Sequence, residues 1–98
     1  MTTDHRREAE MRIAELATLI KSRPDAGTHT ALVDECESLE RAIHAFHMEA
    51  IRFRMYNVDR LLARSGASLP DAARATLEDA RRHLEAAGFH TRSHQAPI

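Results

Sequence analysis

Hydrophobic residues recur at helical spacing in three parts of the chain, and the longest part covers residues 28–64. This stretch contains no proline or glycine and lies between Pro24-Asp25-Ala26-Gly27 and Ser65-Gly66. It therefore predicts one long helix. At 1.5 Å per residue the helix would be about 55 Å long, which exceeds the size of a compact domain of this chain length.

The flanking segments predict two shorter helices, over about residues 3–22 and 69–87. The first carries one apolar stripe and ends before Pro24, because the residue preceding a proline is disfavoured in the α conformation. Ser68-Leu69-Pro70-Asp71 signals the start of the second, and Gly88-Phe89 signals its end. The polar residues 90–98 predict a flexible tail, so residues 1–89 form the expected domain.

Within the long segment, the apolar positions form a heptad seam that later widens. The seam consists of Leu32, Cys36, Leu39, Ile43, Phe46, Ala50 and Phe53, and a second stripe consists of Ile51, Met55, Val58 and Leu62. Together they cover roughly 200° of the helix, so this part must be covered on more than one side. We therefore expect an all-α fold in which a long central helix carries two shorter antiparallel helices. Two such chains would dimerise into a four-helix-type bundle.

The predicted dimer interface combines apolar and polar positions of this wide arc. It consists of Ile51, Arg54, Met55, Asn57, Val58 and Leu62. Polar residues at a helical seam commonly fix register and oligomeric state, which is the role expected for Asn57. Arg54 in such a setting needs a carboxylate partner or a bound anion.

Composition narrows the class of protein. The chain has 98 residues, a formal net charge of −1, no tryptophan and only 4% aromatic residues. Such a chain lacks both the basic field and the stacking platform of nucleic-acid-binding proteins. No segment has the length or pattern of a signal peptide or a membrane span. A single cysteine, Cys36, is typical of a reducing compartment, so the expected location is cytoplasmic.

One cluster on the long segment invites a chemical hypothesis. Glu37, Glu40, His44 and His47 fall on one helical face at spacings of three and four residues. Carboxylates and imidazoles are ligands for iron, zinc or manganese, so these residues are the candidate site for a transition metal ion. The alternative is that they form solvated pairs along the edge of the core.

The remaining residues carry no signature of catalysis or of a bound cofactor. The expected function is thus a non-enzymatic, dimeric α-helical module that binds a protein partner, as an adaptor, accessory subunit or regulator. The alternative function is a metal-binding helical bundle built on the Glu/His cluster.

Overall fold

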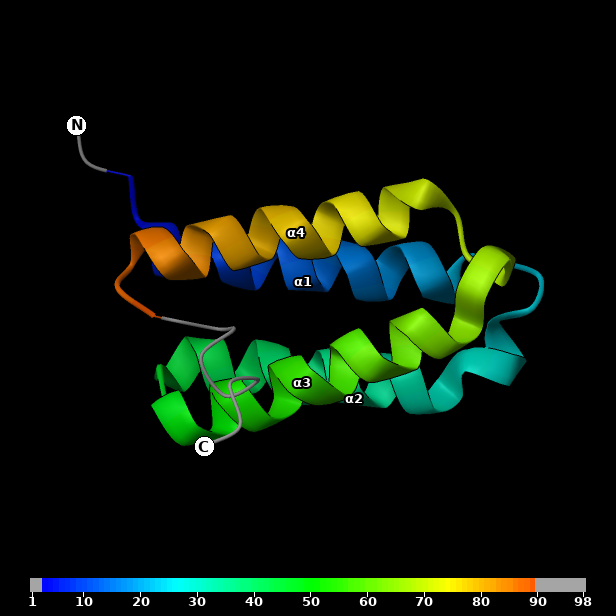
Figure 1. The fold of residues 1–98 in the computed structure, drawn as a ribbon, viewed down its shortest axis with the longest axis horizontal. Helices are drawn as coiled ribbons and strands as arrows, with labels where there is room; N and C mark the ends of the chain where they lie inside the picture. Colours follow the sequence, from blue (N-terminus) through cyan, green and yellow to red (C-terminus); the bar gives the residue numbers. More distant parts are fainter. Residues whose placement is uncertain (1–2, 90–98) are drawn as a thin grey trace.

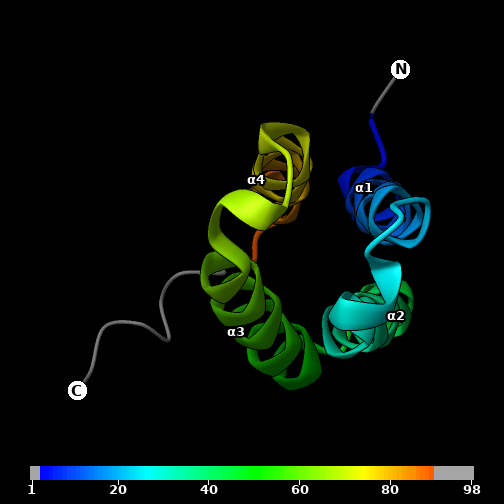
Figure 2. The ribbon, with the colours of Figure 1, turned by 90° about the vertical axis from the view of Figure 1, so that its right-hand side faces the viewer.

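Four α-helices pack side by side in residues 3–89, the part of the chain that the computed structural model describes (Figures 1 and 2). They are α1 (His5–Lys21), α2 (Thr30–Ala45), α3 (Met48–Ser65) and α4 (Asp71–Ala86), with short 3-10 turns at Ala26–His29 and Gly66–Ser68. Successive helices run in opposite directions; α1 packs against α2 and α4, and α2 packs against α3. The all-α class is as predicted.

The predicted long helix is divided into α2 and α3. Phe46 has a φ of 50°, in the left-handed region that residues other than glycine rarely occupy. The amides of Phe46 and His47 donate to the carbonyls of Ile43 and Ala42, the pattern that normally ends a helix at a glycine. The next helix starts at Met48, and the His47 ring caps it by accepting a hydrogen bond from the Ala50 amide. The prediction of one continuous helix over residues 28–64 is therefore wrong.

The core comes from one face of each helix. Helix α1 buries the predicted stripe of Ala9, Ile13, Leu16, Ala17 and Ile20, and α4 buries Ala73, Leu77, Ala80 and Leu84. The break at Phe46 folds α3 back along α2 (Figure 1), so that the apolar sides of both helices join the same core. The second stripe of the wide apolar arc is thus covered within a single chain, whereas Phe53 of the seam stays 57% exposed.

The helix ends agree only partly with the sequence signals. Asp4 caps α1 through its side chain, whereas the predicted cap Ser68 donates to Ser65 and α4 begins after Pro70. The stop at Gly88 is as predicted: its φ is 96°, and the next amide, that of Phe89, donates to Leu84.

None of the helices in residues 3–89 is long and apolar enough to cross a membrane. The predicted tail, residues 90–98, lies outside the described residues.

Candidate functional site

Three of the four residues of the predicted metal cluster, Glu37, His44 and His47, each contact a different partner. Glu37 accepts a hydrogen bond from Lys21 of α1 at 2.8 Å. This bond and the charge of the ammonium lower the pKa of Glu37, while the same contact raises the pKa of Lys21. His47 lies beyond the helix break and caps α3.

The other two members, Glu40 and His44, line an open surface pocket between α1 and α2. The Nδ1 atom of His44 lies 3.2 Å from a carboxylate oxygen of Glu10, and the His44 side chain is 74% exposed. Over the described part of the chain, no three His, Cys, Asp or Glu side chains lie close enough together to hold a metal ion. The geometry therefore favours separate surface pairs over one site.

The residues predicted to form a dimer interface lie largely inside the single chain. Ile51, Met55 and Val58 are fully buried, and Asn57 and Leu62 are nearly so. They are covered by the chain's own helices because α3 folds back on α2. Their burial therefore no longer requires a second protomer.

Arg54 and Asn57 share one acceptor on α2. Arg54 donates to both carboxylate oxygens of Glu35 at 3.0 and 3.1 Å, and the Asn57 amide donates to one of them at 3.0 Å. Glu35 is the carboxylate partner that the position of Arg54 demanded. These contacts tie α3 to α2 within one chain, so Asn57 already has a polar partner there.

A second charged contact ties α4 to α3. The side chain of Arg81 is only 4% exposed, and its guanidinium lies 2.6 Å from the carboxylate of Asp59. The carboxylate of Glu78 lies 3.6 Å from the Nε atom of Arg81. Because α3 and α4 approach each other less closely than the other neighbouring helices, a long arginine side chain suits this gap. The sequence pattern did not predict this pair. Arg81 stands at the edge of an apolar stripe, where an arginine is usually exposed, and Asp59 lies 22 positions away in the chain.

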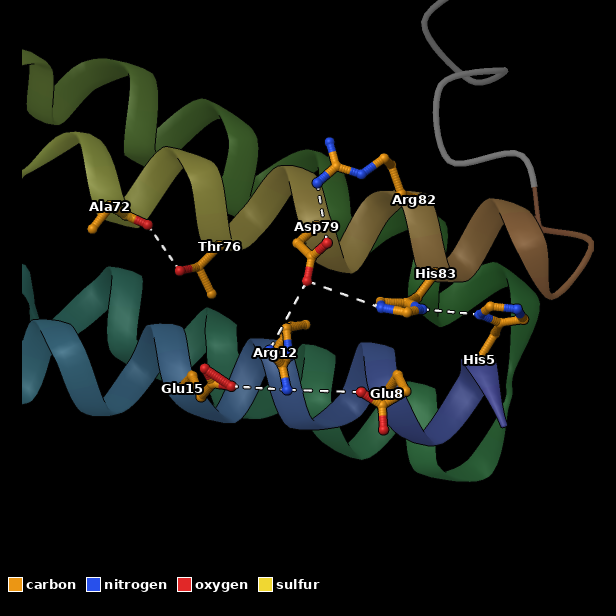
Figure 3. A network of polar contacts seen from close by, with 9 residues as sticks. All are labelled: His5, Glu8, Arg12, Glu15, Ala72, Thr76, Asp79, Arg82 and His83. Atoms are coloured by element: carbon orange, nitrogen blue, oxygen red, sulfur yellow. Dashed lines mark hydrogen bonds and ion pairs between the residues drawn. The ribbon is translucent and has the colours of Figure 1, made fainter. Parts of the chain in front are cut away.

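Figure 3 shows the polar contacts between α1 and α4. The Nδ1 atoms of His5 and His83 are 2.9 Å apart, so that one imidazole donates to the other. Asp79 lies 3.9 Å from the other nitrogen of His83 and 4.0 Å from Arg12. Arg12 also contacts Glu15 and Glu8 of its own helix. The His5–His83 and Arg12–Asp79 contacts therefore join α1 to α4.

The outer side of α3 carries the most distinctive surface of the described chain. Phe53 is 57% exposed and Tyr56 is 45% exposed. With Glu49 and Arg60 they stand at spacings of four, three and four residues, which aligns them on one side of the helix. We call Glu49, Phe53, Tyr56 and Arg60 the outer stripe. It lies opposite the buried positions of α3, and α3 itself lies at an edge of the bundle (Figure 2).

Arginine side chains cover the two aromatic rings of the outer stripe in part. The Arg54 guanidinium lies 5.1 Å from the centre of the Phe53 ring, and that of Arg60 lies 5.9 Å from the centre of the Tyr56 ring. These distances are within the range of cation–π attraction. The stripe therefore combines aromatic and arginine side chains, the types that are enriched at protein interfaces.

Sequence reasoning placed Phe53 in the buried seam and so missed the outer stripe. The available signal was the second stripe that starts at Ile51. Once Ile51 and Met55 are taken as the buried face, the helical repeat puts Phe53 on the opposite side.

The chain matches no protein-family model, no curated protein and no solved structure in the comparisons made.

Proposed function

We propose that this protein is a non-enzymatic, cytoplasmic α-helical module that self-associates and binds a protein partner, as an adaptor, accessory subunit or regulator. The observation that carries the proposal is the outer stripe of α3. Two aromatic side chains about half exposed on one helix, flanked by charged residues, have the composition of an interface centre with a polar rim.

The position of the stripe adds support. The buried positions of α3 already belong to the core, and contacts with Glu35 tie the helix to α2. The outer side of α3 is thus presented on a helix that is held from within, so a partner can bind there without opening the fold. Rigid elements lose less conformational freedom on association.

Sedimentation velocity from micromolar to millimolar concentration tests the proposal. The wild-type chain should shift from one-chain to two-chain mass as its concentration rises, and Phe53→Ser should remain a single chain. The matched control is Met11→Ser, which removes an apolar side chain that is 45% exposed on α1 and should leave self-association unchanged. Equal behaviour of the two variants, or a wild-type chain that stays monomeric, would contradict the proposal.

A further inference from the structure

The outer stripe is symmetric in spacing and opposite in charge at its two ends. Glu49 precedes Phe53 by four residues, and Arg60 follows Tyr56 by four. Reading the stripe in reverse gives the same order of charged, aromatic, aromatic and charged positions, but with the signs of the charges exchanged. This pattern complements itself when two copies of the helix run in opposite directions.

We infer that the partner on this face is a second copy of the same chain, with the two α3 helices packed antiparallel about a two-fold axis between Phe53 and Tyr56. This inference rests on the proposed function and specifies its geometry. One rotation places Phe53 of each copy against Tyr56 of the other and, at the same time, Glu49 of each copy beside Arg60 of the other. Both pairs come into register together because 49 and 60 have the same midpoint as 53 and 56.

The monomer leaves these side chains in a state suited to that pairing. Glu49 is 86% exposed, and its carboxylate lies 3.7 Å from Arg52 of its own helix. Tyr56 and Phe53 keep about half of their surface exposed, and each carries an arginine over its ring. In the dimer the four rings would form the dry centre, and the two Glu49–Arg60 pairs would form the rim. A two-fold interface of this kind is closed, so association stops at two chains.

A parallel arrangement of the same helices would be less favourable. It would place Glu49 against Glu49 and Arg60 against Arg60, and like charges that face each other repel. The sign exchange along the stripe therefore selects the antiparallel arrangement. The same exchange of charge favours a second copy over an unrelated acidic partner, because Glu49 beside the aromatic centre would repel such a partner.

Charge reversal separates these arrangements by sedimentation equilibrium of the full chain. In the antiparallel dimer, Glu49→Lys alone or Arg60→Glu alone turns both rim attractions into repulsions and should raise the dimer dissociation constant about tenfold. The double variant, Glu49→Lys with Arg60→Glu, restores two opposite-charge pairs and should return to the wild-type value. The control Glu85→Lys, an exposed position on α4, should have no effect. Melting curves of each variant identify any loss of helix stability that accompanies the change at Glu49.

The possible outcomes distinguish this inference from the proposed function. A dimer that Phe53→Ser disrupts, but in which the double variant is as weak as the single variants, keeps the surface and overturns the antiparallel pairing. Dissociation constants that no charge reversal changes would also overturn it. A wild-type chain without self-association overturns both proposals.

Discussion

Glu35 joins α2 to two side chains of α3 at once. Its side chain is 20% exposed and accepts hydrogen bonds from both Arg54 and Asn57. A partly buried carboxylate that serves two donors is costly to remove, because both donors then lack an acceptor. The neighbouring Asp34 is exposed and offers a natural comparison on the same helix.

Glu35→Ala should therefore lower the free energy of unfolding by about 1–3 kcal/mol, whereas Asp34→Ala should leave it nearly unchanged. Urea unfolding followed by circular dichroism measures both values. Equal stabilities of the two variants would show that the Glu35 contacts do not stabilise the helical hairpin formed by α2 and α3.

Cys36 reports on the core through its thiol. Burial, and secondarily the carboxylates of Glu37 and Glu35, raises the pKa of Cys36 from 9.0 to about 12. Since the thiolate is the reactive form, a thiol reagent at pH 8 should modify the native chain far more slowly than the urea-unfolded chain. Fast modification under native conditions would place Cys36 outside the core.

The same pKa shift predicts a loss of stability at alkaline pH. Below pH 9.0 both the folded and the unfolded chain keep the thiol proton, so this group has no effect on stability there. Between about pH 9 and 12 the unfolded chain releases the proton while the folded chain retains it, and stability falls as the pH rises. Unfolding free energies at pH 8 and pH 10.5 test this, because Cys36→Ala should weaken the dependence on pH. An unchanged dependence in that variant would assign the effect to other groups.

At the scale of the helices, Phe46 decides the topology. A residue other than glycine in the left-handed region costs about 1–2 kcal/mol, and here the cost is offset by the burial of the two stripes that meet across the hairpin. In a single chain, a continuous helix would leave part of the second stripe (Ile51, Met55, Val58 and Leu62) in water. The local preference of the backbone therefore yields to the packing of the core.

Replacing Phe46 by glycine and by alanine tests this conformation, because the sign of the difference in stability between the two variants depends on the backbone at this position. Both variants lose the ring, so only the backbone distinguishes them. With Phe46 at a φ of 50°, Phe46→Gly should be more stable than Phe46→Ala by about 1 kcal/mol. In a continuous helix the glycine variant would be the less stable by about 0.5–1 kcal/mol. Ala63→Gly, at an exposed position inside α3, supplies the control for that opposite sign.

The sequence was sufficient for α1 and α4 but not for the middle of the chain. The stripe of α1 and the Gly88 stop of α4 are local signals, and the structure confirms both. Phe46 gives no such signal, because it occupies a position where glycine is usual. The change of apolar phase between Phe46 and Ile51 did mark the break, although it also fitted a dimer of long helices.

The candidate site was harder to predict for the same reason. Contacts such as Glu35–Arg54 join residues 19 positions apart, and only the hairpin brings them together. Likewise, a continuous helix placed Glu37 and His47 on one face, while the break separates them. The outer stripe became recognisable once the buried side of α3 was known.

At the scale of the whole molecule, residues 3–89 form a core within a single chain, and two aromatic side chains on α3 stay about half exposed. Such a protein is expected to be a stable monomer in dilute solution and to pair weakly and reversibly. This differs from an obligate dimer, in which burial of Ile51 and Val58 would need the second chain. Aspartate at either position should now unfold the monomer, because it would bury a charge without a partner.

The most direct test of the account is a dilution series of amide spectra by NMR, from millimolar to micromolar concentration. Signals of Glu49, Phe53, Tyr56 and Arg60 should move together with concentration and follow one dissociation constant, while the signal of Met11 on α1 stays in place. Spectra that do not change with concentration, or changes confined to another helix, would contradict the central claim that the outer side of α3 is the surface of association.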